Sequence, residues 1–357
     1  MKSTYCLVGA FWDGKPADDE MADIVPFDAT SGPAGSADSL FDLGGKRRYL
    51  RLTDLLSCDD ECELDDLLEG LTDSEIVYIA VDWRPNSSNP TIDDYFSLRV
   101  RQVFAELQVR LPSCHIALMT GGPLCCPVAI RRMTIPWLFQ LAEEFESYAA
   151  SRGIRFDGYG FPLVPSSCYA DVVPGEMLPY THRHSRLCKD ASRAAICFFM
   201  NDRRIYPRFE CLPDEIENYR GYAAVVVPDL TVTADMDLPW QGFIMLLNQL
   251  FGAALAVNGI KIIANTRCGS LTSVHYLRAI PKGVLCASGS LGCGVLTHEA
   301  DFDYLSKLLL LLPSVSLVYG KKDPIAFGQF STMGIPVKRY PDIHVRSVRA
   351  SCSKSAA

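Results

Sequence analysis

The chain has 357 residues, of which 48% are hydrophobic and 21% are charged, a composition typical of folded rather than disordered proteins. Its formal net charge of −8 argues against a broad nucleic-acid-binding surface, because such surfaces carry an excess of Lys and Arg. The 14 cysteines are scattered and mostly lie in apolar runs. This pattern predicts reduced thiols in a cytoplasmic protein rather than a secreted disulfide framework.

The first 70 residues are predicted to form an irregular segment that contains one short helix. Between residues 59 and 69 the leucines fall on one helical face and the acids on the other. Cys58 and Cys62 would share a face of this helix. Two thiols without a second pair are weak evidence for zinc, so we predict no metal here.

Residues 71–193 are predicted to form a first α/β block. Its predicted elements are strands at 76–81, 115–119 and 154–160 and helices at 92–111 and 136–152. Asp82 follows the first of these strands, and Cys125-Cys126 come after the second. Without an assignable partner histidine, the two cysteines do not support nucleophilic catalysis.

The proline-rich stretch 161–193 interrupts this alternation of strands and helices. It is either a connection between domains or a long active-site loop. His182-Arg183-His184 lies in this stretch with Cys188 close behind. A polar surface loop is favoured over a metal cluster, because the surrounding residues are typical of loops.

Residues 194–345 are predicted to form a second α/β block, followed by a polar tail at 346–357. The predicted strands are 194–200, 223–227, 260–264, 284–287, 315–319 and 336–339, and the helices are 239–258, 271–280, 302–312 and 323–333. Short apolar runs that end in polar residues and precede helices are typical of parallel strands with crossover helices. We therefore predict an α/β fold with mainly parallel strands, either TIM-barrel-like or built of two packed α/β halves.

The stretch 238–260 carries no charge and is long enough to span a bilayer. Gln241 and Asn248 lie inside it, Pro239 and Gly252 interrupt it, and predicted strands flank it. We therefore predict a helix packed inside an α/β protein, with no membrane association.

Polar residues that follow the predicted strands are the best candidates for a site, because the carboxyl ends of parallel strands meet on one face. Asp229, Asn265 and Arg267 are the candidate catalytic residues, with Asp82 as a weaker one. Asp229 would act as a general base or hold a cation, and Arg267 would clamp a carboxylate or phosphate. The alternative is that each residue caps the next helix or pairs locally. Tyr319 also follows a strand.

The run Ser288-Gly289-Ser290-Leu291-Gly292 follows another strand and is a candidate anion-binding loop. Small residues let backbone N–H groups approach an anion closely. The glycine spacing matches neither the dinucleotide nor the Walker pattern, so the run identifies no particular cofactor, and the cofactor is unknown from the sequence. A tight turn that needs glycine for positive φ explains the run equally well.

Several short motifs in the second block carry a family resemblance. They are Val227 to Asp229, Asn258 to Asn265, Ile280 to Gly283, Ser288 to Cys293 and Val318 to Gly320, together with Met236, Gln241 and Asn248. With these motifs, residues 206–340 resemble a bacterial and phage family known as domain-of-unknown-function family 4417. The resemblance implies a prokaryotic, cytoplasmic setting in phages or mobile elements. It implies no particular activity.

Two functions remain open from the sequence. The first is an enzyme or binding protein with a small-ligand or anion pocket at the strand ends. The second is a non-catalytic accessory protein that binds DNA or a protein partner, which is favoured by the basic clusters at 46–48, 131–132 and 203–204. The acidic total charge weighs against the DNA version.

Overall fold

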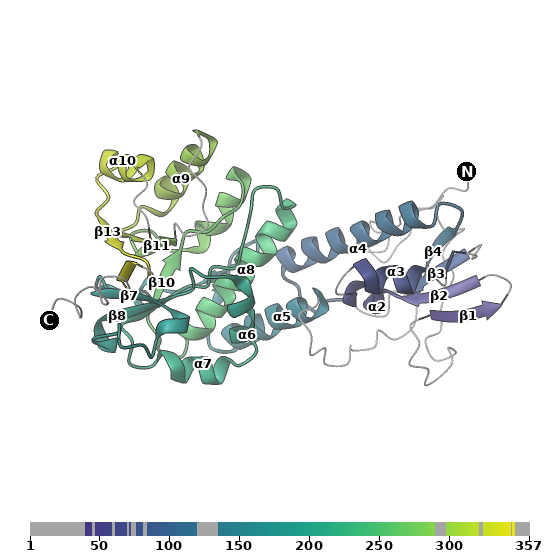
Figure 1. The fold of residues 1–357 in the computed structure, drawn as a ribbon, viewed down its shortest axis with the longest axis horizontal. Coiled ribbons are helices and arrows are strands. Elements are labelled where there is room, and N and C mark those ends of the chain that lie inside the picture. Colours follow the sequence, from purple (N-terminus) through teal and green to yellow (C-terminus); the bar gives the residue numbers. More distant parts are fainter. Residues whose placement is uncertain are drawn as a thin grey trace. The chain divides into compact units, whose positions relative to one another are not determined.

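The fold is described from a computed structural model, drawn in Figure 1. The structure describes residues 40–44, 47–58, 61–69, 71–72, 76–80, 84–119, 135–289, 298–320, 324–343 and 345–346. The chain divides into two compact units. The first contains residues 1–88 and 92–143, and the second contains 89–91 and 144–357. Asp82, Cys125 and Cys126, which the sequence singled out, lie outside the described residues.

The first unit contains a four-stranded sheet in the order β1-β2-β3-β4. The strands are β1 (Leu40–Gly44), β2 (Arg47–Arg51), β3 (Ile76–Ala80) and β4 (His115–Met119). The helices are α2 (Leu52–Ser57), α3 (Glu61–Glu69), α4 (Pro90–Arg110) and α5 (Ile135–Ser151). The last turns of α5 belong to the second unit. Strands β2, β3 and β4 are parallel, whereas β1 and β2 form an antiparallel pair. Tyr95 and Phe96 of α4 pack on Phe139 of α5, with ring centroids 5.0 Å and 5.7 Å apart.

The second unit is built around a seven-stranded parallel sheet that is nearly closed as a barrel. Its strands are β7 (Glu176–Pro179), β8 (Ala194–Cys197), β9 (Ala224–Val226), β10 (Ile262–Asn265), β11 (Cys286–Gly289), β12 (Ser316–Tyr319) and β13 (Val337–Tyr340). Each strand pairs with the next one along the chain. This order is the one expected when every crossover winds in the same direction around a barrel.

Side chains from all seven strands form one buried cluster inside this sheet. Its members on the strands are Met177, Ala195, Cys197, Ala224, Val226, Ile263, Ala287, Leu317, Tyr319 and Tyr340. Residues alternate between the two faces of a strand, so these positions point inward and their neighbours point toward the helices. The alanines leave room for the two tyrosines, and the interior is therefore a packed core rather than a pore.

Side chains also connect the chain around the first strand of the sheet with the chain around the last one. The Tyr340 hydroxyl, from β13, donates to the Pro174 carbonyl at 2.6 Å. Arg346 donates to the Met177 carbonyl at 3.2 Å and to the Glu176 carboxylate at 2.9 Å, and both of those residues belong to β7. These bonds hold the two edge strands together where the backbone ladder ends.

Helices surround the strands of the second unit in Figure 1. They are α6 (Tyr206–Phe209), α7 (Leu212–Tyr219), α8 (Leu238–Ala256), α9 (His298–Leu311) and α10 (Pro324–Thr332), with a 3-10 helix, η6 (Leu271–Ala279). Val318 of β12 points outward and packs on Leu308 of α9 and Phe330 of α10. Helix α8 is buried along most of its length, as predicted for the uncharged stretch. Among the described residues, no helix has the length and apolar character needed to cross a bilayer.

The predicted α/β class with mainly parallel strands is confirmed, but several segments differ from the prediction. The first 70 residues, predicted to be irregular with one short helix, contain β1, β2 and the two helices α2 and α3, and the helices α6 and α7 were not predicted. The stretch predicted as a strand at 154–160 is a hairpin in which β5 (Arg155–Phe156) pairs antiparallel with β6 (Pro162–Leu163). The Asp157 carboxylate accepts the N–H groups of Tyr159 and Phe161 at 2.8 Å and 2.9 Å, and these bonds fold the chain into a turn. The stretch predicted as irregular contains β7, the first strand of the barrel.

Leu312, directly after α9, has a left-handed backbone conformation with φ of 43°. This conformation costs an L-residue roughly 1–2 kcal/mol and is usually taken by glycine at helix ends. We expect Leu312→Gly to stabilise the protein by about 0.5–1 kcal/mol, because glycine removes the strain but gains freedom in the unfolded chain. Urea denaturation measures the change.

The matched control is Leu309→Gly, because Leu309 is similarly exposed but lies within α9. This substitution should destabilise the protein by about 1 kcal/mol, the usual cost of glycine in a helix. If both variants lost stability equally, the left-handed conformation would not be a source of strain.

Candidate functional site

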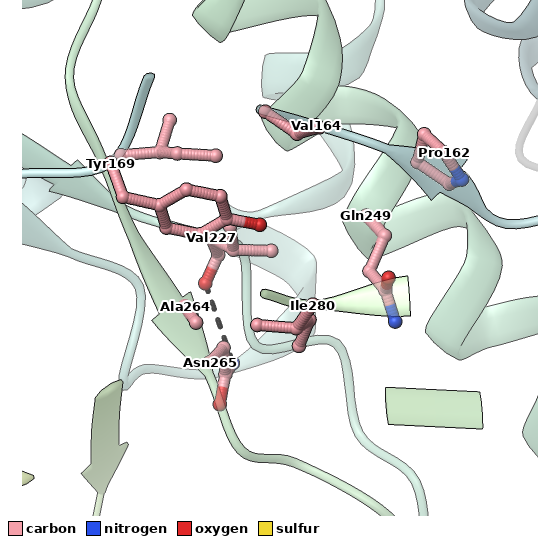
Figure 2. A pocket seen from close by; sticks show the side chains of 9 residues that line it. Pro162, Val164, Tyr169, Val227, Gln249, Ala264, Asn265 and Ile280 are labelled. Carbon is pink, nitrogen blue, oxygen red and sulfur yellow. Dashed lines mark hydrogen bonds between the residues drawn. The ribbon is translucent and has the colours of Figure 1, made fainter. Parts of the chain in front are cut away.

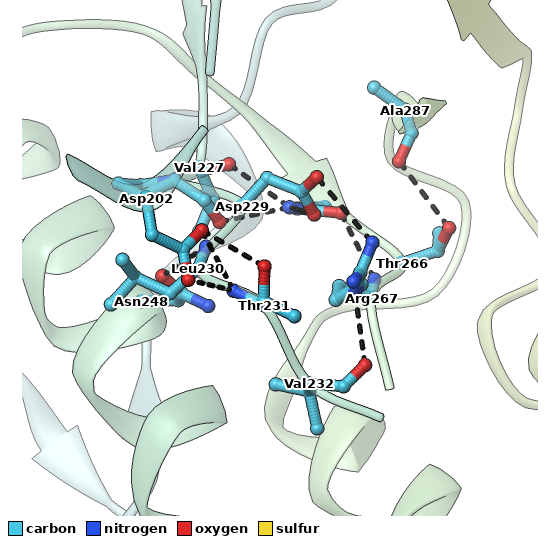
Figure 3. Close-up of polar contacts among 12 residues, drawn as sticks. Asp202, Val227, Asp229, Leu230, Thr231, Val232, Asn248, Thr266, Arg267 and Ala287 are labelled. Atoms are coloured by element: carbon cyan, nitrogen blue, oxygen red, sulfur yellow. Dashed lines mark hydrogen bonds and ion pairs between the residues drawn. The ribbon is translucent and has the colours of Figure 1, made fainter. Parts of the chain in front are cut away.

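Three of the residues predicted from the sequence, Asp229, Asn265 and Arg267, meet at the carboxyl ends of β9 and β10. Figure 3 shows Asp229 and Arg267 side by side there. Asn265, the last residue of β10, donates its side-chain N–H to Asp229 Oδ1 at 2.9 Å and to the Pro228 carbonyl at 2.9 Å. The Asn265 side-chain oxygen accepts the backbone N–H of Arg267 at 3.0 Å. Asn265 therefore holds the acid on one side and the arginine on the other.

The Arg267 guanidinium lies beside the Asp229 carboxylate without a tight contact. Its Nη1 atom is 3.8 Å from Asp229 Oδ2, which is an ion pair longer than a hydrogen bond. Its Nε–H donates to the Val232 carbonyl at 3.3 Å and fixes the plane of the group. The side chain is 26% exposed, so part of it lies in contact with solvent beside Asp229.

The Asp229 carboxylate is 12% exposed and has a raised pKa. Burial raises the pKa to about 6, against the opposing effects of Arg267 and the hydrogen bond from Asn265, while the nearby Asp202 charge adds to the increase. A carboxyl group with this pKa exchanges its proton close to neutral pH. Such a group is suited to general acid–base work.

The loop after β9 forms hydrogen bonds with the segment after β8 and with helix α8. Thr231 donates its backbone N–H and its hydroxyl to the carboxylate of Asp202, at 3.2 Å and 3.0 Å. Asn248 of α8 accepts the N–H of Leu230 at 3.3 Å. Asp202 follows β8, so the ends of β8, β9 and β10 are joined through side chains. Asp202 was not among the residues predicted from the sequence, although the same strand-end rule identifies it.

The candidate anion-binding loop is only partly described. Ser288 and Gly289 end β11, which lies beside β10 through the pairing of Ala287 with Asn265. A Cβ atom on Gly289 would lie 2.5 Å from the Phe199 ring. The absence of a side chain at Gly289 therefore serves core packing. Ser290 and Gly292 lie outside the described residues.

Tyr319 does not belong to the exposed end of the barrel. Its side chain is fully buried and stacks on Phe199, with ring centroids 5.8 Å apart. Its hydroxyl accepts the N–H of Ile343 at 3.0 Å. These two rings close the top of the barrel core beneath the strand ends.

Histidine and cysteine side chains form no metal site in the part of the chain that the structure describes. There, no three His, Cys, Asp or Glu side chains gather closely enough to hold an ion. In the predicted His182-Arg183-His184 motif, His182 Nδ1 lies 3.0 Å from the Thr181 hydroxyl, and Arg183 stacks on Tyr180 at 4.1 Å.

A small cavity lies on the outer side of β9 and β10, shown in Figure 2. Its volume is about 10 Å³, and its lining includes Tyr169, Val227, Gln249, Ala264 and Asn265. A cavity of this size holds a single water molecule at most. It is therefore not the predicted small-ligand pocket.

Comparison with known proteins gives one match. A family model described as a domain of unknown function, DUF4417, matches residues 158–340. This range begins earlier than the stretch predicted from the sequence and takes in all seven strands of the barrel. No curated protein and no solved structure matched the chain.

Proposed function

The chain belongs to the DUF4417 family, whose activity is unknown, and we propose that its barrel unit binds a small anionic ligand between Arg267 and Asp229. The observation that supports this function best is the loose ion pair between these two side chains at the carboxyl ends of parallel strands. In parallel α/β folds this end of the sheet is where ligands bind.

The two side chains would have different roles. Arg267 would pair its terminal N–H groups with the oxygens of a carboxylate or phosphate, as arginine does in bidentate recognition. Asp229, with its pKa raised to about 6, would exchange a proton with the bound ligand. Asn265 would keep Asp229 Oδ1 occupied and leave Oδ2 on the side of Arg267. If the protein is an enzyme, we propose proton transfer as the step that Asp229 performs.

We also propose a cytoplasmic setting in a bacterium, phage or mobile element. The scattered cysteines support a reducing compartment. The resemblance to a bacterial and phage family supports the origin.

The binding proposal is tested by calorimetric titration of the full chain with sulfate, inorganic phosphate and acetate. We expect Arg267→Gln to weaken binding about 10-fold to 100-fold, the usual effect of losing a charge-assisted hydrogen bond. The matched control is Arg278→Gln, because Arg278 also pairs with an aspartate, Asp157 at 3.3 Å, but on η6. Equal affinities of Arg267→Gln and the wild-type chain would refute the proposal, as would a wild-type chain that binds none of the three anions at millimolar concentration.

The non-catalytic alternative, nucleic-acid binding, has one observation in its favour. Arg203 and Arg204 are exposed and directly follow Asp202, which bonds the loop that carries Asp229. If DNA binds there, its affinity should fall steeply with salt, because phosphate contacts release counterions. The double variant R203A/R204A should then lose the gel shift that the wild-type chain gives at low salt.

A further inference from the structure

One buried side chain of α8 bonds both loops of the candidate site. Gln241 is 2% exposed, and its side-chain oxygen accepts the backbone N–H of Ser270 at 2.9 Å and the Ser270 hydroxyl at 3.0 Å. Its side-chain N–H donates to the Met236 carbonyl at 2.6 Å. Met236 belongs to the loop that begins at Asp229, and Ser270 belongs to the loop that contains Arg267.

The two loops close tightly around this glutamine. A Cβ atom on Gly269 would lie 2.5 Å from the Gln241 side-chain oxygen and 2.5 Å from the Thr233 carbonyl. Glycine is therefore required at this position because of space. The close approach leaves the loops little freedom to separate without breaking the bonds of Gln241.

Other polar side chains of α8 have narrower roles. Asn248 accepts the N–H of Leu230, at the start of the first loop. Gln249 donates to the Tyr276 carbonyl in η6 at 3.2 Å. Gln241 is distinguished from both by its bonds to two loops at once. A bond that spans two loops fixes their separation, whereas a bond to one loop fixes only that loop.

We propose that Gln241 is a positioning residue that sets the separation between the Arg267 guanidinium and the Asp229 carboxylate. These groups lie on the two loops that Gln241 joins, and their nearest atoms are 3.8 Å apart. Their interaction depends on distance, so a shift of either loop changes how strongly Arg267 stabilises the ionised Asp229. The consequence for anion binding rests on the proposed function, whereas the effect on Asp229 does not.

The test is Gln241→Glu, followed by two measurements on the full chain. An ionised glutamate keeps an acceptor for Ser270 but places an oxygen against the Met236 carbonyl, and that contact is repulsive. Carboxyl-carbon NMR should then give a higher pKa for Asp229 than in the wild-type chain, because Arg267 moves away. Calorimetry with sulfate at pH 8 should show about tenfold weaker binding than wild type.

Protonation should rescue the variant, because a neutral glutamic acid again offers one donor and one acceptor. The ratio of sulfate affinities between variant and wild type should therefore approach one as the pH falls toward 5. The matched control is Gln249→Glu, the same change two turns along α8, which should leave both the Asp229 pKa and the sulfate affinity unchanged.

The proposal is overturned if Gln241→Glu is folded by circular dichroism and has the wild-type pKa of Asp229. If Gln241→Glu does not fold, Ser270→Ala removes the hydroxyl bond to Gln241, together with the contact to the Thr272 hydroxyl, and keeps the backbone bond to Gln241. It should raise the same pKa by less, and an unchanged pKa there also overturns the proposal. If the Asp229 pKa rises but the wild-type chain does not bind sulfate, the positioning role stands and the anion-binding function is the part that fails.

Discussion

Asp229→Asn is expected to make the protein more stable at neutral pH by roughly 3 kcal/mol. The folded-state pKa of about 6 lies above the ordinary value of 3.8, so the folded chain binds the proton more tightly than the unfolded chain. The contribution of Asp229 to stability is therefore largest below pH 3.8, falls as the pH rises through about 6 and stays lost above it. Each tenfold difference in proton affinity corresponds to about 1.4 kcal/mol, which gives the expected gain. Asparagine resembles the protonated acid at every pH and avoids this loss.

Urea denaturation at pH 7.5 and pH 4.5 measures this effect. The advantage of Asp229→Asn over the wild-type chain should be large at pH 7.5 and should shrink at pH 4.5. Asp157→Asn is the control, because Asp157 is similarly buried, at 15% exposure, but accepts two backbone N–H groups. That variant should gain no stability. A less stable Asp229→Asn chain at pH 7.5 would contradict the prediction.

A gain in stability of Asp229→Asn at neutral pH would indicate that Asp229 has a functional rather than a structural role. A carboxylate that destabilises the fold at neutral pH has no structural reason to be there, because asparagine would keep the hydrogen bond with Asn265 and remove the buried charge. Groups retained against stability are concentrated in functional sites.

The strand-end rule predicted the meeting of Asp229, Asn265 and Arg267 because it depends only on strand periodicity and parallel order. Both of these can be recognised in local sequence. The rule does not say which side chains bond to one another. The hydrogen bonds of Asn265 to Asp229 and Arg267, and the 3.8 Å ion pair between those two residues, could therefore not be predicted. Gln241 and Asn248 were recognised as polar residues in an apolar helix, but their bonds to the loop after β9 depend on how α8 packs.

Strand β7 was missed for a different reason. Its four residues include Pro179 and lie in a proline-rich stretch, so neither length nor composition indicates a strand. The strand forms because it pairs with β8, from Glu176 opposite Ala194 to Pro179 opposite Cys197. Pro179 is tolerated because β7 is at the edge of the sheet, where one side of the strand needs no ladder bond.

Glu215 of α7 is a buried acid that the sequence did not single out, and it lies next to the end of β7. It is 1% exposed, and its carboxylate accepts hydrogen bonds from the hydroxyls of Tyr180 and Tyr219. Arg208 of α6 lies 3.3 Å from the same carboxylate. Tyr180 directly follows β7, so Glu215 joins the end of this edge strand to α6 and α7. Burial and the adjacent carboxylate raise the pKa of Tyr219, which keeps its hydroxyl a donor.

We expect Glu215→Ala to destabilise the protein by about 3 kcal/mol. The change leaves two buried hydroxyls without their acceptor and Arg208 without its counter-charge, and removing one partner of a buried pair typically costs about 3–5 kcal/mol. We expect a value at the lower end of this range, because Arg208 is 31% exposed and its guanidinium can be hydrated when Glu215 is removed. Glu217→Ala is the matched control on the same helix, because Glu217 is 67% exposed and pairs with Arg220 at 3.1 Å. It should change stability by at most about 0.5 kcal/mol.

The part of the barrel that loses stability in Glu215→Ala shows whether Glu215 acts at the sheet edge or as an ordinary core contact. Since Tyr180 ties the end of β7 to α7, hydrogen exchange in Glu215→Ala should increase first at the amides of β7, before those of β10 or β11 at the centre of the sheet. Uniform exchange across all seven strands would mean that Glu215 supports the whole barrel rather than its edge. A loss in urea below about 1 kcal/mol would mean that water replaces the carboxylate as the partner of both tyrosines.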